Sequence, residues 1–175
     1  MGLRDLQQSK ALDALLGALS QARLQTTTNP PLLLKIAPDL EAAQLQDIVQ
    51  LALHHKLDGL IISNTTIKRP VSLKNPHASQ MGGLSGQPLF DISTATLAAA
   101  YAITKGKIPL IGVGGVASAA QAYQKIKAGA NLVQLYTGLV YGGFPLLYQI
   151  QRGLRQYLKQ DGYGNVREAV GTAVN

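Results

Sequence analysis

Apolar residues along this chain alternate between short continuous runs and stretches with helical spacing. Leucines within residues 4–24 recur three or four positions apart, which predicts a helix there. Residues 32–36 instead form a short unbroken apolar run, typical of a strand buried on both faces of a sheet. The same patterns predict further strands near residues 59–63, 109–113 and 132–136, and helices near 41–56, 91–105, 118–128 and 145–159. This alternation predicts a parallel sheet with right-handed crossovers.

The length of the chain limits which parallel fold it can form. A complete eight-stranded β/α barrel takes about 250 residues, whereas this chain has 175. We therefore expect an α/β fold of about four parallel strands with outer helices, equivalent to half of a (β/α)8 barrel. A hydrophobic content of 46% against 14% charged residues fits a single globular domain over residues 1–175.

Charge and composition narrow the possible ligands. Sixteen basic against nine acidic residues give a net charge of +7, but the basic residues are scattered and aromatic residues are few. This distribution argues against nucleic-acid binding and favours a small anionic ligand. The absence of Cys excludes disulfides, and three His without a His-Glu-x-x-His pattern predict no metal site. No apolar stretch has the length of a transmembrane helix.

Two consecutive strand ends carry a pattern typical of phosphate binding. Residues 112–116, Gly-Val-Gly-Gly-Val, follow one apolar run, and residues 132–138 end another with Tyr136 and Thr137. Glycine allows backbone N–H groups to approach an anion closely and tolerates a positive φ. Gly114 and Gly115 could instead make only a tight turn, and Tyr136 could face the core. Because both patterns occur at consecutive strand-to-loop junctions, residues 112–116 and 132–138, a phosphate site is favoured over these alternatives.

Residues 64–90 lack any regular pattern, and an internal loop of that length is usually functional or disordered. The loop begins with Asn64 and Thr65, at a strand's carboxyl end, where β/α barrels gather their active-site groups. Further along, residues 81–88 combine flexible glycines with the hydroxyl of Ser85. Asn64 could alternatively close an Asx turn.

Five short motifs, in order and in register, together resemble one enzyme family. They are Lys-Ile-Ala-Pro-Asp at 35–39, Asn-Thr-Thr at 64–66 with Arg-Pro at 69–70, Gly-Gly-Leu-Ser-Gly at 82–86, Gly-Val-Gly-Gly at 112–115 and Gln-Leu-Tyr-Thr at 134–137. The chain resembles class 2, quinone-dependent dihydroorotate dehydrogenase over essentially all 175 residues. The similarity covers only the carboxyl-terminal half of that family's barrel, strands 5–8.

The resemblance implies a flavoprotein oxidoreductase that oxidises dihydroorotate to orotate in pyrimidine biosynthesis, with FMN as cofactor and a quinone as electron acceptor. Lys35 matches a lysine that would stabilise negative charge on the reduced flavin. Its stem could otherwise pack at the barrel mouth with its ammonium in water. Asn64 and Thr65 match the substrate-binding pair. The remaining positions implied to contact FMN are Ser63, where the family usually has Thr, and Ser85, Gly86, Gly114, Gly115, Tyr136 and Thr137.

The resemblance also implies that part of the site lies outside this chain. The family's general base is a serine on a loop after its fourth strand, so no catalytic base is assigned here and the chain alone is expected to be inactive. The family's quinone tunnel and membrane contact also have no counterpart, which leaves a cytoplasmic location or one peripheral to the inner membrane open. Expected partners are the missing amino-terminal half, as a longer or separate chain, or another copy of this chain.

Two other functions fit the same residues. A flavin-free barrel enzyme such as an isomerase could bind a sugar phosphate at Gly114 and Gly115, and a half-barrel could serve as a non-enzymatic assembly module. Among the remaining polar residues, His54 and His55 close a helix and are expected in solvent. Asp39 and Asp91 precede helical patterns and are expected to cap them.

Overall fold

Four short parallel strands form the centre of the molecule, in the order β1-β2-β3-β4. The computed structural model describes residues 5–174. The strands are β1 (Leu33–Ile36), β2 (Gly59–Ile62), β3 (Leu110–Val113) and β4 (Leu132–Gln134). Each strand lies within its predicted range and is shorter by one or two residues. This arrangement confirms the predicted parallel sheet and leaves β1 and β4 at its edges.

The predicted helices are present, with small shifts at their ends. They are α1 (Ser9–Leu24), α2 (Ala42–His54), α3 (Phe90–Thr104), α4 (Ala119–Lys127) and α6 (Pro145–Gln160). The first helix begins later than predicted, because a separate 3-10 turn occupies Asp5–Gln7; residue 4 lies outside the described residues. Two short helices were not predicted, α5 (Thr137–Gly142) and α7 (Val166–Ala169), since helices of six and four residues are too short to show periodicity.

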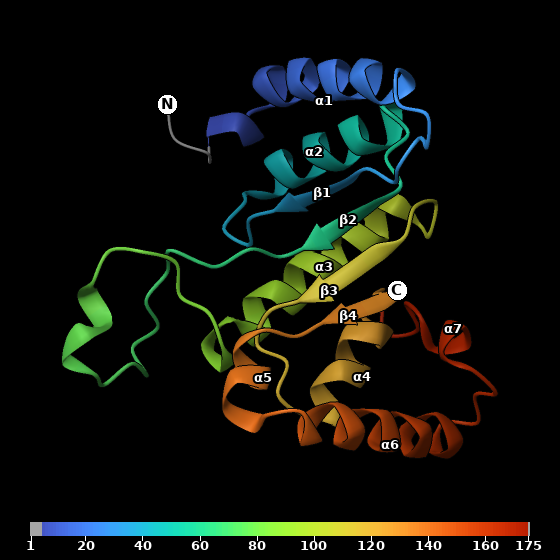
Figure 1. The fold of residues 1–175 in the computed structure, drawn as a ribbon. Helices are drawn as coiled ribbons and strands as arrows, with labels where there is room; N and C mark the ends of the chain where they lie inside the picture. The colour runs from blue at the N-terminus through green and yellow to red at the C-terminus, as the bar shows by residue number, and fades with distance from the viewer. Residues whose placement is uncertain (1–4, 175) are drawn as a thin grey trace.

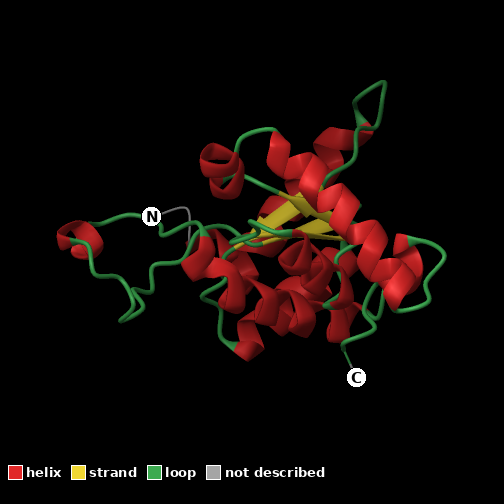
Figure 2. Cartoon of the chain, turned by 90° about the horizontal axis from the view of Figure 1, so that it is seen from below, coloured by secondary structure: helices red, strands yellow, loops and turns green. Residues whose placement is uncertain are grey.

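All four strands point the same way, so their carboxyl ends meet at one side of the molecule (Figure 1). That side also carries α5 and the segment between β2 and α3. This segment, residues 63–89, projects away from the helical body in both views (Figures 1 and 2). It holds two short 3-10 helices, Pro76–Ser79 and Gln87–Leu89, and is otherwise irregular as expected.

One face of the sheet packs against the helices and forms the main core. Leu34, Ile36, Leu60, Ile62 and Leu110 alternate onto this face and join the cluster that includes residues of α1, α2 and α3. Residues between these positions face the other way, because side chains alternate along a strand.

The opposite face carries one row of residues in register across all four strands. Lys35 lies beside Ile61, Ile61 beside Ile111, and Ile111 beside Leu132. Ile111 is buried at the centre of the row, whereas Leu132 at the edge is 62% exposed. This face of the sheet is therefore exposed mainly towards the edge strand β4.

A second packing contact holds α6 on α4. A Cβ atom built on Gly153 of α6 would overlap the Cβ atom of Ala119 of α4. By contrast, a Cβ atom on Gly17 of α1 would meet its nearest neighbour, a His55 ring carbon, at an ordinary 3.7 Å. Both glycines lie inside helices, where Ala is intrinsically favoured over Gly.

We predict opposite effects of the same substitution at these two glycines. Gly153→Ala should lower the free energy of unfolding by about 1–3 kcal/mol, because α6 must shift away from α4. Gly17→Ala should raise it by about 0.5–1 kcal/mol through helix propensity alone. Urea denaturation followed by circular dichroism measures both values. An increase in stability for Gly153→Ala would contradict the close helix contact.

Candidate functional site

A cavity of about 510 Å³ lies at the carboxyl ends of the strands, within the range of small-molecule sites. It brings together segments from β1, the end of β2, the projecting loop, the turn after β3 and the start of α5. All ten predicted site residues line it: Lys35, Ser63, Asn64, Thr65, Ser85, Gly86, Gly114, Gly115, Tyr136 and Thr137. The structure therefore unites positions as far apart in the sequence as Lys35 and Thr137; their roles as ligand contacts stay predictions.

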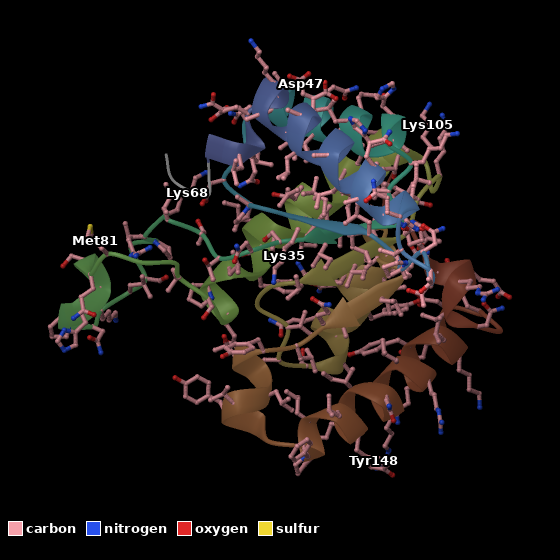
Figure 3. The ribbon with its side chains drawn as sticks, turned by 45° about the horizontal axis from the view of Figure 1, so that its top comes forward. Lys35, Asp47, Lys68, Met81, Lys105 and Tyr148 are labelled. Atoms are coloured by element: carbon pink, nitrogen blue, oxygen red, sulfur yellow. The ribbon has the colours of Figure 1, made fainter. Side chains whose placement is uncertain are left out.

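Lys35 is the cation of this cavity. It lies on β1 one residue before the strand's end and its side chain is drawn near the middle of the molecule (Figure 3). The residue is exposed, and no group in the described part of the chain forms a hydrogen bond or ion pair with its ammonium. A cation without a partner among residues 5–174 is available to an anionic or electron-rich ligand.

Backbone hydrogen bonds to the neighbouring strands β1 and β3 hold the segment after β2 in place. The Ser63 N–H donates to the Val113 carbonyl (3.0 Å) and the Asn64 N–H donates to the Ile36 carbonyl (2.8 Å), so the adjacent strand ends fix this segment. The Ser63 hydroxyl donates to the Asn64 carbonyl (2.9 Å), and the side-chain oxygen of Asn64 accepts from the Thr65 N–H (2.8 Å). This local turn occupies the amide oxygen of Asn64 and leaves its NH2 group for a ligand.

Gly114 and Gly115 form a turn that packs tightly on the beginning of α3. Their φ angles are +113° and +75°, where side chains are disfavoured. A Cβ atom on Gly115 would meet the backbone N of Phe90 at 2.6 Å, and one on Gly114 would meet the Ser93 hydroxyl at 2.8 Å. The glycines are therefore required by the protein's own packing, as a tight turn demands. A phosphate role for the same turn stays a prediction.

The second junction, at Tyr136 and Thr137, lines the same cavity as this turn. Thr137 donates a hydrogen bond from its hydroxyl to that of Ser85 (3.0 Å), which links the start of α5 to the projecting loop. Gly86 has a φ of +81° and faces Thr137 across a gap that would leave an added Cβ atom only 3.1 Å from its methyl group. Tyr136 is 78% exposed. The alternative that Tyr136 faces the core is therefore wrong.

Asp39 does not cap a helix, contrary to our expectation. Glu41 is the N-cap residue of α2, in a reciprocal capping box with Gln44. Asp39 instead accepts hydrogen bonds from the Thr66 hydroxyl and from the Ile67 N–H (2.9 Å). Thr66 in turn pairs with Leu84 in an isolated antiparallel bridge. The carboxylate thus fixes the point where the projecting loop leaves the sheet.

Arg69 organises the rest of that loop, a role that the sequence pattern did not suggest. Its guanidinium lies within hydrogen-bond distance of six backbone carbonyls, those of Thr66, Ile67, Lys68, Ala78, Gln80 and Gly82, and the first three share the two protons of Nη1. The five N–H donors of Arg suit such a set of acceptors. The loop that lacked any periodic pattern is therefore a folded lobe, with Met81 near its far end (Figure 3).

Two further expectations need correction. His54 is exposed as expected, but His55 is half-buried and its Nε2 lies 2.7 Å from the Asp13 carboxylate, where it joins α2 to α1. Asp91 lies within the first turn of α3, and the N-cap position belongs to Leu89. Asp91 still carries its charge at the positive end of the helix, which is favourable.

Lys125 is a buried cation that the sequence analysis missed. It lies on α4 and is fully buried. Its ammonium donates to the Ser93 hydroxyl (2.6 Å) and lies 5.3 Å from the centre of the Phe90 ring. Burial lowers the pKa of Lys125 to about 7, and the Asp91 carboxylate partly opposes this shift. The sequence carried one signal for this burial, because Lys125 follows the core residue Ala122 by three positions and so lies on the same face of α4.

Comparisons with known proteins agree with this architecture. The family model of dihydroorotate dehydrogenase matches residues 1–158. A dihydroorotate dehydrogenase (quinone) of Parvibaculum lavamentivorans is 51% identical over 99% of this chain and 49% of its own length. A mitochondrial dihydroorotate dehydrogenase (quinone) of Arabidopsis thaliana is 52% identical over 97% of this chain and 38% of its own length. The chain spans about half the length, or less, of the curated relatives it matches.

A solved structure shows the same partial coverage. The DHODH from Eimeria tenella in complex with ferulenol superimposes with a TM-score of 0.93 and 37% identity, over 98% of this chain and 50% of the solved one. This match confirms the expected fold class, four parallel strands with outer helices that make up half of a β/α barrel. Within residues 5–174, no helix is both long and apolar enough to cross a bilayer.

We predict that Asp39 controls how often the projecting loop opens. Asp39→Ala removes the acceptor of the Ile67 N–H, which should favour opening by about 1–3 kcal/mol. Limited proteolysis with mass spectrometry should then show cleavage within residues 66–84 at least about tenfold faster, because cleavage follows the open population. Asp39→Asn keeps one oxygen acceptor, so its cleavage rate should lie between those of the unaltered protein and of Asp39→Ala. Equal rates for all three proteins would contradict this anchoring role.

The buried Lys125 predicts a pH dependence of stability. Its pKa is about 7 in the folded chain and 10.5 ordinarily, so between these values the unfolded chain binds one more proton. Stability should therefore rise with pH across this window, by roughly 1 kcal/mol per pH unit, and show no such rise below it. Denaturation at several pH values measures the slope, and Lys125→Met should abolish it. The same slope in both proteins would show that Lys125 titrates normally.

Proposed function

The chain belongs to the dihydroorotate dehydrogenase family, and on that premise we propose that it supplies the carboxyl-terminal half of an FMN-dependent enzyme that oxidises dihydroorotate to orotate. The observation that carries the proposal is the single cavity lined by all ten residues that the family resemblance implies. The parallel topology brings the strand ends together, and every residue that the resemblance implies lines the resulting cavity. The substrate and cofactor of the complete enzyme remain part of this proposal.

The residues present fit FMN. The tight Gly114–Gly115 turn and the neighbouring Thr137 would hold the phosphate, while the hydroxyls of Ser63 and Ser85 offer polar contacts along the cavity. The positive φ angles of the turn allow backbone N–H groups to face an anion. When bound, FMN supplies a two-electron acceptor for the hydride of dihydroorotate.

Lys35 would provide the electrostatic part of the reaction. Its ammonium lies at the cavity without a partner among the described residues. Placed beside the flavin ring, it would stabilise the negative charge that develops during reduction. Because the ammonium would already be in position, the protein would not have to rearrange during the reaction. The half-buried Thr65 and the free NH2 group of Asn64 would orient the pyrimidine, whose ring carbonyls accept hydrogen bonds.

The other half of the site would come from the amino-terminal half of the barrel. No residue of this chain is assigned as the general base, which in the resembled family is a serine on a loop of that half. Val140 and Tyr141 of α5, and Phe144 after it, have exposed side chains, and Tyr141 lines a second cavity together with Gly86 and Thr137. The amino-terminal half would cover these apolar side chains. Electron transfer to a quinone, and a location peripheral to the membrane, would belong to the assembled enzyme.

We predict that reassembly restores the reaction. This chain alone should bind FMN weakly and show negligible flavin reduction by dihydroorotate, because loss of a general base costs about 10²–10⁴ in rate. Adding the amino-terminal half of the Parvibaculum lavamentivorans relative should restore reduction in stopped-flow absorbance. In that complex Lys35→Ala should slow reduction, whereas Lys10→Ala, an equal charge change on the exposed face of α1, should not.

Two outcomes would contradict the proposed activity, and a third would contradict only the role of Lys35. Rapid reduction by this chain alone would mean that the base lies within it. A complex that takes up no flavin but binds a sugar phosphate would favour a flavin-free barrel enzyme. An unaltered rate for Lys35→Ala would remove Lys35 from the flavin site while leaving the activity itself established.

A further inference from the structure

A buried lysine lies directly behind the turn at Gly114 and Gly115. We propose that Lys125 is a positioning residue of this anion-binding turn, fixing the Gly114 carbonyl through Ser93 and placing a positive charge behind the turn that favours a bound phosphate. The inference rests on the proposed function, because it takes the turn to be the phosphate site. Lys125 itself lines none of the cavity and so acts through Ser93.

The hydrogen bonds run in one direction from Lys125 to the turn. The Lys125 ammonium donates to the Ser93 hydroxyl oxygen (2.6 Å). The Ser93 hydroxyl lies 3.1 Å from the Gly114 carbonyl and 3.0 Å from the Phe90 carbonyl, and its single proton can serve either. Because Lys125 supplies the only proton donated to that oxygen among the described residues, it leaves the hydroxyl proton for these carbonyls. Such chains of donors strengthen one another.

The glycines of β3 and its turn make room for this lysine. A Cβ atom on Gly112 would lie 3.3 Å from Cδ of Lys125, and one on Gly114 would lie 3.0 Å from Cβ of Ser93. Larger residues at these positions would displace Lys125 and Ser93. The Gly-Val-Gly-Gly segment therefore suits both an anion in front of the turn and a buried cation behind it.

The positive charge of Lys125 is poorly compensated within the protein. One hydrogen bond to Ser93 and the face of the Phe90 ring are its recorded contacts, and it forms no ion pair within residues 5–174. The carboxylate of Asp91 on α3 acts on Lys125 through its charge alone, without a hydrogen bond or ion pair. A buried cation in this state is costly unless an anion comes close.

A phosphate at the turn would supply that anion. Its charge would favour the protonated form of Lys125, so phosphate binding and proton uptake are linked and each strengthens the other. Burial lowers the pKa of Lys125 to about 7. The preference for a phosphate-bearing ligand should therefore decline as the pH rises above about 7.

The test compares FMN with riboflavin, which lacks the phosphate, in the chain reassembled with the relative's amino-terminal half. Lys125→Met and Ser93→Ala should each weaken FMN at least about tenfold and change riboflavin affinity less than about twofold. Lys127→Met is the matched control, since Lys127 lies on the same helix but pairs with Asp161. It should leave both affinities within about twofold. Circular dichroism checks that each variant is folded.

A second measurement works without any variant. Calorimetric titration of FMN in buffers of different ionisation enthalpy should show proton uptake between about pH 7 and 9, where the phosphate of FMN no longer titrates. Riboflavin should show none. Absent uptake, or a Lys125→Met protein that keeps the full preference for FMN, would overturn the role of Lys125 alone. If the unaltered complex binds FMN no better than riboflavin, the phosphate assignment of the proposed function fails, and this inference fails with it.

Discussion

Parallel pairing of the four strands in sequence order is the constraint on which the rest of this structure depends. Because every strand runs the same way, every strand ends at the same edge of the sheet, and each following segment starts there. The register that places Lys35 beside Ile61, and Ile111 beside Leu132, also aligns these ends. A cavity at that edge is a direct consequence of the topology, and it is lined by the last residues of the strands and by the residues that follow them.

The segment after β2 shows how a long loop can become part of such a cavity. Asp39 fixes its first residues and Arg69 gathers its backbone carbonyls into a folded lobe. The bridge between Thr66 and Leu84 returns the chain to the sheet, so that Ser85 reaches Thr137. The loop is therefore held mainly by hydrogen bonds of two charged side chains, since it buries few apolar residues of its own.

The turn after β3 combines two structural demands. It must pack on the first residues of α3, which excludes side chains at Gly114 and Gly115. Its Gly114 carbonyl also accepts a hydrogen bond from the buried Ser93 hydroxyl, which in turn accepts one from the Lys125 ammonium. A cation in an apolar interior usually lowers stability, and the positioning role that we propose for Lys125 would account for its presence beside the turn. The requirement for glycine here comes from the protein's packing as much as from any ligand.

Much of this molecule was determined by local sequence. An unbroken apolar run indicates a strand that is buried on both faces, and apolar residues at helical spacing indicate a helix that is buried on one face. The four strands and the five longer helices could therefore be predicted within a few residues. Polar and glycine residues just after strands, such as Asn64 and Gly114, predicted where the cavity lies for the same topological reason. The short helices α5 and α7 could not be predicted, because six and four residues are too few to carry a period. Only the tertiary structure decided the partners of Asp39, His55, Arg69 and Lys125. The binding partner and the burial of a charged side chain depend on segments brought together by folding, and Lys125 meets Ser93 across 32 positions of the chain.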